Sequence, residues 1–313
     1  MFRFQGDRSN LLKDLATRVS QVWSSFDSAR ESEPEISTKT LDVLSGDLPR
    51  AGRGETVALS QAVDILDQSL AQSRPRFFAY IGSSGLEIGA VADFLASSYD
   101  INLAVDSKAA TLLERQAAKW IGQFIGYHDN AKGLFTSGGT ISNITALAAA
   151  RTKRFPDARK NGVTVPVAIY CSAEAHYSNI RGVELLGFGS SAVRSIPIDA
   201  DRRMDVVAFE AAVKEDLANG VVPLAVIASS GTTLTGAIDP LDAIADVCER
   251  YQIWMHVDGA YGGAGLFAPS VRDRYDGVEL VDSIVVDPHK WLFAPFDGAA
   301  LIYREPWLAK RVH

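Results

Sequence analysis

Cysteine is scarce in this chain of 313 residues, which contains only Cys171 and Cys248. Two cysteines form no disulfide framework and offer no CxxC-type metal cluster, so the pattern predicts neither a small disulfide-rich scaffold nor a metal site. Free thiols are typical of a reducing compartment, and a cytoplasmic location is therefore expected.

Positive charge is also in short supply. Lys and Arg total 31 against 38 Asp and Glu, which gives a net charge of -7. Such a chain creates no basic field for a polyanion, so no nucleic-acid partner is expected.

Long apolar runs are missing as well. None approaches the ~20 residues that a membrane span needs, and the N-terminal MFRFQGDRSN lacks the apolar segment of a signal peptide. No membrane association is expected. The chain stops at residues 309–313 without a capping signal, so a fragment is also expected.

What is present is a globular composition with 47% hydrophobic residues. Apolar residues at helical spacing predict an amphipathic helix over 9–26, followed by an irregular connector over 30–55. We therefore expect an N-terminal helical arm and connector at 1–55 and a large domain at 56–313.

The large domain alternates short β-branched runs with helical segments. The predicted strands are 165–172, 193–198, 223–230, 253–258, 282–287 and 299–304, and the predicted helices are 142–154, 177–187, 205–218 and 240–251. Runs that are apolar on both faces indicate a buried, mainly parallel sheet in an α/β doubly wound fold. Ligands of such sheets bind at the carboxyl ends of the strands.

Two of these strand ends carry charged side chains. Asp258 follows one strand and is succeeded by the small residues Gly259 and Ala260, an arrangement that suits a flat ligand close to the backbone. Lys290 follows another strand beside Trp291 and is a candidate nucleophilic amine. The alternatives are an Asp that caps a turn and a Lys that extends to solvent.

Further polar residues follow a glycine pair and two other strands. Gly138 and Gly139 open a helix with Thr140 and Ser142, as in a phosphate site at a helix N-terminus, although an ordinary N-cap also explains the hydroxyls. His176 and Thr233 come after two more strands. A phosphate cradle, an acid, a planar residue and a strand-end Lys together predict bound pyridoxal 5'-phosphate.

Five motifs occur in order along the chain. They are FTSGGTISNITAL (135–147), SAEAHYSN (172–179), SSGTTLTGAID (229–239), WMHVDGAYGG (254–263) and DSIVVDPHKWL (282–292). In this order they resemble the motifs of the group II pyridoxal-phosphate-dependent amino acid decarboxylases, a family that includes aromatic amino acid, histidine and glutamate decarboxylases. The resemblance runs from about Pro75 to the C-terminus.

The resemblance implies roles for individual residues. Lys290 would form a Schiff base with the cofactor and move protons, Asp258 would pair with the pyridine nitrogen, and His176 would stack on the ring. The other implied cofactor-binding residues are Gly139, Thr140, Thr233, Ala260, Asp287 and His289. Tyr80 and Ser83 would lie on the substrate side with His176.

The resemblance also implies the architecture and the reaction. The fold would be the large domain of fold type I, with a seven-stranded sheet and without the family's C-terminal small domain. The N-terminal arm would embrace a second subunit of a homodimer, or else pack on its own subunit. The expected reaction is decarboxylation of an L-amino acid, and the alternatives are another carbon–carbon lyase, a desulfurase, or a truncated, non-catalytic protein that binds the cofactor.

Overall fold

The structure is a computed structural model that describes residues 6–309. It divides into two compact units, Met1–Ser84 and Gly85–His313. The first unit extends beyond the predicted arm of 1–55, because the helix α3 (Glu55–Asp67) packs against α1 (Arg8–Ser25).

The first unit is helical. The helix expected at 9–26 is α1, and Asp7 caps it by accepting hydrogen bonds from the backbone amides of Ser9 and Asn10. A short helix, α2 (Thr38–Leu44), lies between α1 and α3 in the sequence. Asp67, the last residue of α3, accepts hydrogen bonds from Arg30 at 2.7 Å and Arg74 at 2.8 Å.

The second unit begins with two helices and continues as the expected alternation of strands and helices. Its helices are α4 (Glu87–Tyr99), α5 (Ala109–Ile125), α6 (Gly139–Arg154), α7 (Ala158–Asn161), α8 (Ser178–Leu185), α9 (Val206–Ala218), α10 (Leu241–Tyr251) and α11 (Pro306–Ala309). Its strands are β1 (Lys132–Thr136), β2 (Val167–Ser172), β3 (Val193–Ile196), β4 (Val222–Ser229), β5 (Trp254–Asp258), β6 (Ser283–Val286) and β7 (Ala299–Tyr303). Within the described residues, no helix is both long and apolar enough to cross a membrane.

The seven strands form one sheet in the order β1-β7-β6-β5-β4-β2-β3. Pairing is parallel from β3 through β6, so the expectation of a mainly parallel sheet is confirmed. β7 runs antiparallel to both of its neighbours. The link of residues 287–298 has no α-helix to carry the chain across the sheet, and the chain therefore returns in the opposite direction.

Strand β1 is absent from the strands expected from the sequence. It lies at the edge of the sheet, contains Gly133, and is exposed at Lys132 and Phe135. An edge strand of this kind lacks the continuous apolar run that marks the central strands.

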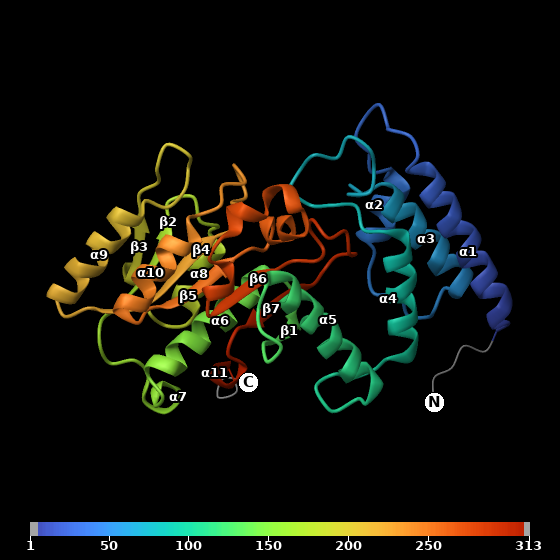
Figure 1. The fold of residues 1–313 in the computed structure, drawn as a ribbon. Coiled ribbons are helices and arrows are strands. Elements are labelled where there is room, and N and C mark those ends of the chain that lie inside the picture. The colour runs from blue at the N-terminus through green and yellow to red at the C-terminus, as the bar shows by residue number, and fades with distance from the viewer. Residues whose placement is uncertain (1–5, 310–313) are drawn as a thin grey trace. The chain divides into compact units, whose positions relative to one another are not determined.

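Alternate strand residues face two separate hydrophobic cores. Tyr170, Val226 and Val257 belong to the core that includes residues of α5, α9 and α10. Ile169, Ile227 and Trp254 belong to the core that includes residues of α6 and α8. Helices therefore cover both faces of the sheet, as Figure 1 shows.

The loops after β4 and β5 pass each other closely at Gly262. A Cβ added at Gly262 would contact the Ser230 carbonyl oxygen and lie 2.6 Å from the Gly231 Cα. Gly262→Ala should therefore lower the free energy of unfolding by roughly 1–3 kcal/mol, because two backbone segments must move apart.

Denaturant unfolding measures this change. The matched control is Gly298→Ala, where an added Cβ meets no atom within 4 Å. Equal stability of the two variants would contradict the predicted close approach.

Candidate active site

A pocket of about 270 Å³ lies at the carboxyl ends of the strands. Every cofactor-binding residue expected from the sequence lines it: Gly139, Thr140, His176, Thr233, Asp258, Ala260, Asp287, His289 and Lys290. They come from the segments that follow β1, β2, β4, β5 and β6. The topology of the sheet explains this convergence, because parallel strands bring their carboxyl ends to one edge.

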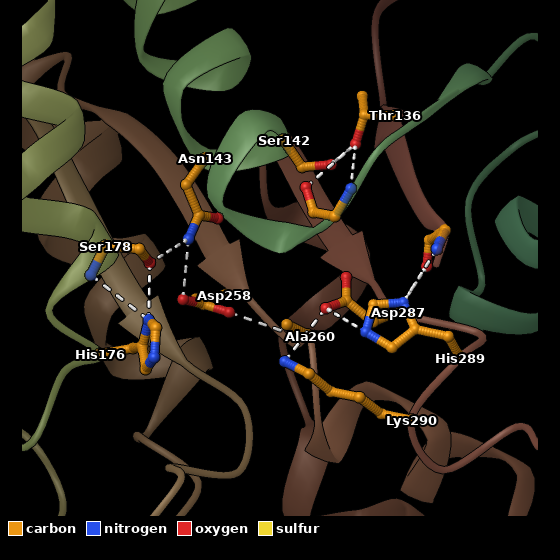
Figure 2. A network of polar contacts seen from close by, with 12 residues as sticks. Thr136, Ser142, Asn143, His176, Ser178, Asp258, Ala260, Asp287, His289 and Lys290 are labelled. Atoms are coloured by element: carbon orange, nitrogen blue, oxygen red, sulfur yellow. Dashed lines mark hydrogen bonds and ion pairs between the residues drawn. The ribbon is translucent and has the colours of Figure 1, made fainter. Parts of the chain in front are cut away.

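Asp258 reaches the pocket as the last residue of β5. Side chains alternate along a strand, so Asp258 shares with Trp254 and His256 the face that is covered by α6. Its Oδ1 accepts a hydrogen bond from the Ala260 amide at 3.2 Å, and its Oδ2 accepts one from Asn143 Nδ2 at 2.9 Å. Both carboxylate oxygens are therefore held (Figure 2).

His176 lies beside this carboxylate network. The backbone amide of Ser178 donates to His176 Nδ1 at 3.3 Å, and the Ser178 hydroxyl lies 2.7 Å from the same nitrogen. Partial burial lowers the pKa of His176, and the nearby Asp258 opposes this shift. The neutral imidazole is therefore favoured, with its ring held from one side (Figure 2).

Lys290 enters the pocket from the segment after β6. Its Nζ lies 3.0 Å from Asp287 Oδ2, and the Asp287 side chain is 1% exposed. Burial raises the pKa of Asp287, and the positive charge of Lys290 acts in the opposite direction. Asp287 Oδ2 thus faces Lys290, with His289 Nε2 3.9 Å away, and Asp287 Oδ1 is buried without a hydrogen-bond partner in the described structure.

The start of α6 closes another side of the pocket. Gly138 is the N-cap residue and gives no side-chain hydrogen bond to the first turn, so the first amides of α6 lack a side-chain cap. A Cβ added at Gly139 would lie 3.0 Å from Asp287 Oδ2 and 3.2 Å from Ala260 Cβ. Glycine therefore lets the helix start this close to the strand ends.

Ser142 does not line the pocket. Its hydroxyl lies 2.8 Å from Thr136 Oγ1, which braces the turn before the helix. Thr140, by contrast, is exposed and lines the pocket.

His289 and Thr233 complete the lining. His289 Nδ1 lies 2.6 Å from the Gly298 carbonyl oxygen, so the backbone near β7 fixes the ring. Thr233 is exposed, whereas its neighbour Thr232 is buried and its hydroxyl lies 2.8 Å from that of Thr235.

Tyr80 and Ser83 belong to the first compact unit. Tyr80 is exposed and Ser83 is partly buried. Neither residue is part of the lining formed by the second unit, and their substrate-side role stays a prediction.

Several polar residues of the site were not expected from the sequence. Asn143 and Asn179 donate to Asp258, Ser178 contacts Asn143, and His256 lies behind Asn143. A signal for Asn143 exists, because it stands one helical turn after Gly139 among apolar residues. A polar residue on a buried helix face needs a partner, and Asp258 is that partner.

The match to known proteins agrees with this geometry. Residues 43–312 match the family model described as the pyridoxal-dependent decarboxylase conserved domain. The chain belongs to this family.

Curated relatives and solved structures match over most of the chain. The chain is 36% identical to mouse cysteine sulfinic acid decarboxylase over 290 residues, which are 90% of this chain and 57% of the relative. It is 39% identical to L-2,4-diaminobutyrate decarboxylase of Rhizobium meliloti over 261 residues, which are 82% of this chain and 52% of the relative. The chain spans about half the length of these curated relatives.

The crystal structure of Oryza sativa TDC with PLP and tryptamine superposes with a TM-score of 0.88 at 27% identity. The match covers 99% of this chain and 66% of that chain. The fold type I architecture expected from the sequence is therefore confirmed.

The buried His256 makes the stability of the fold depend on pH. Burial lowers its pKa from 6.5 to about 4, and the nearby Asp258 opposes this shift. The unfolded chain takes up a proton below about pH 6.5 that the folded chain refuses, so stability present above that pH is lost as the pH falls towards 4. His256→Gln removes this titration. Between pH 7 and pH 4 the free energy of unfolding of this variant should rise by roughly 3 kcal/mol relative to that of the wild type.

Denaturant unfolding of both proteins at the two pH values gives the change in the free energy of unfolding for each. The contributions of the other titrating groups cancel when the two changes are subtracted. A stability difference that is the same at both pH values would contradict a neutral, buried His256.

Proposed function

We propose that this chain binds pyridoxal phosphate in the strand-end pocket and forms the cofactor-binding part of an L-amino acid decarboxylase. The observation that carries the proposal is that Lys290 and Asp258 line the same pocket as the uncapped start of α6. The pocket thus holds an amine, a carboxylate and backbone donors, which are three groups that a pyridoxal phosphate site uses.

The residues present fit the shape and charge of the cofactor. The glycine start of α6 leaves backbone amides for a phosphate, and Thr140 adds a hydroxyl at the same point. Asp287 Oδ2 lies 3.0 Å from Lys290 Nζ, whose positive charge offsets the repulsion between this carboxylate and a phosphate dianion. Thr233 and His289 would lie against the bound group.

The bound cofactor supplies an electron sink for the electron pair left when the bond to the carboxylate breaks. In the proposed reaction Lys290 Nζ would hold the cofactor covalently, and Asp258 would keep a proton on the ring nitrogen. His176 would lie against the ring. Cα loses carbon dioxide and gains one proton, so an L-amino acid gives the corresponding amine.

The substrate class remains an L-amino acid, with Tyr80 and Ser83 proposed to contact it. The matched relatives are named for substrates of different chemistry, among them cysteine sulfinic acid and 2,4-diaminobutyrate. The two free, buried cysteines support a cytoplasmic location.

The proposal predicts release of carbon dioxide from L-amino acids labelled at the carboxyl carbon. The assay uses aromatic, acidic and diamino substrates with this chain and with any longer natural chain that contains it. Lys290→Ala should lower turnover by roughly 10³-fold or more, because it removes the attachment point and a proton carrier.

The matched control is Lys214→Ala, since Lys214 is exposed on α9. Release of sulfur or of a carbon–carbon cleavage product without carbon dioxide would favour the alternative reactions. Cofactor binding without any turnover would favour a non-catalytic protein.

We also propose that the chain forms a homodimer. No residue of α4 is buried, although Ile88, Phe94, Leu95 and Tyr99 lie on it. The following segment exposes Leu113 and Trp120 on α5. Apolar exposure on this scale is typical of an interface and supports a second copy of the chain as its partner.

Sedimentation of the chain should give the mass of two copies, and Leu95→Lys should shift it towards one. Val207→Lys is the control, because Val207 is 80% exposed on α9. In Figure 1, α9 and α4 lie far apart. Dissociation by Val207→Lys, or a monomeric wild type, would contradict the proposed interface.

A further inference from the structure

A continuous line of buried polar side chains extends from Asp258 into the core between α6 and the sheet. His256 and Ser283 are each 0% exposed and Asn143 is 1% exposed. Trp254 Nε1 donates to Ser283 Oγ at 3.0 Å, and Ser283 Oγ lies 2.9 Å from His256 Nδ1. His256 Nε2 lies 2.9 Å from Asn143 Oδ1, and Asn143 Nδ2 donates to Asp258 at 2.9 Å.

The hydrogen bonds of this line run in one direction. The indole N–H of Trp254 can only donate, so Ser283 Oγ accepts there and has its own hydrogen to give to His256 Nδ1. Burial holds the imidazole neutral, so the ring carries one hydrogen; with Nδ1 accepting from Ser283, that hydrogen is on Nε2 and is donated to Asn143 Oδ1. Each donor therefore points along the line towards Asp258.

The reverse orientation of Asn143 is disfavoured. It would turn the amide oxygen towards Asp258 Oδ2 and towards Asn179 Oδ1, which now accepts from Asn143 Nδ2 at 2.9 Å. Oxygen atoms would then face one another in a buried site, and a hydrogen bond to a charged carboxylate would be lost. The alternative tautomer, with His256 Nδ1 donating to the Ser283 carbonyl oxygen at 3.2 Å, would require this reversal.

We propose that Asn143 is the positioning residue for Asp258, and that His256, oriented by Ser283, fixes the Asn143 amide with its donor towards the carboxylate. Asp258 is then held at Oδ2 by Asn143 at 2.9 Å, with Asn179 Nδ2 at 3.4 Å from the same oxygen, and at Oδ1 by the Ala260 amide. The part of this inference that concerns the cofactor rests on the proposed function, because it assumes that Asp258 meets the ring nitrogen.

The first test needs no cofactor. Nitrogen-15 NMR of the histidine rings reports which nitrogen carries the hydrogen, and the signal of His256 among the five histidines is identified by its loss in His256→Gln. We expect a neutral ring with hydrogen on Nε2 between about pH 5 and pH 8. A ring with hydrogen on Nδ1, or a charged ring at about pH 6, would overturn the proposed direction of the line.

The second test uses the chain loaded with pyridoxal phosphate. It measures two quantities: the dissociation constant of the cofactor, and the pH at the midpoint of the change in the absorption band of the bound cofactor. Asn143→Leu removes the amide at similar volume and should weaken retention about tenfold. It should also raise the midpoint by about one unit, because a less protonated ring withdraws fewer electrons from the nitrogen of Lys290. His256→Leu should act in the same direction.

Two variants separate positioning from packing. His256→Gln keeps a donor towards Asn143. Its dissociation constant for pyridoxal phosphate should stay within about twofold of the wild-type value, and its pH midpoint should match that of the wild type. Tyr127→Phe removes another buried hydrogen bond, from the Tyr127 hydroxyl to the Val281 carbonyl at 2.9 Å, and should lower stability without moving the midpoint.

The outcomes distinguish this inference from the proposed function. A wild type that does not retain pyridoxal phosphate would refute the proposed function, while the NMR test would still decide the direction of the line. A wild-type midpoint in Asn143→Leu, or equal damage by His256→Gln and His256→Leu, would overturn the positioning role alone.

Discussion

The packing of α6 against the sheet is the interaction on which the rest of the structure depends. Ala146 and Leu147 of this helix are fully buried in the core that covers one face of the sheet. The same helix starts at Gly139, where the missing Cβ allows contact with Ala260 and Asp287, and carries Asn143 to Asp258. The placement of α6 against the sheet therefore determines both the hydrophobic burial on that face and the geometry of the pocket.

This arrangement places opposite charges where water is limited. Asp287 is almost fully buried next to Lys290, and its pKa rises because burial outweighs the attraction of the ammonium group. Asp258 instead keeps three hydrogen-bond donors, from Asn143, Asn179 and the Ala260 amide, and partial contact with solvent. The two carboxylates of the pocket are thus in different environments, one paired with an ammonium group and the other with neutral amide donors.

Much of this site could be predicted from the sequence, because strand ends can be located from apolar runs. Asp258, Lys290 and His176 each follow a run of buried strand residues, and parallel strands must bring these positions together. Strand β1 could not be located in this way, since its exposed edge gives no apolar run. The antiparallel direction of β7 follows from the missing crossover helix and leaves no mark in the strand itself.

The support behind the site could not be predicted for a different reason. His256 lies in a strand that reads as apolar, and its partners Asn143 and Ser283 are 113 and 27 residues away in the sequence. A hydrogen-bonded line of this kind depends on which faces of α6 and β5 pack together. The spacing of residues within one helix or strand does not reveal this. Tyr80 and Ser83 likewise rest on a resemblance between segments and not on contacts.

Lys290 is the proposed attachment point for pyridoxal phosphate, and the roles proposed for the other pocket residues depend on it. The most direct measurement is reduction of the cofactor-loaded chain with borohydride, followed by peptide mapping of the labelled residue by mass spectrometry. We expect one label, on Lys290 in the DPHKWL segment, and no label there in the unreduced protein after denaturation. A label on another lysine, or no label with cofactor in excess, would contradict it.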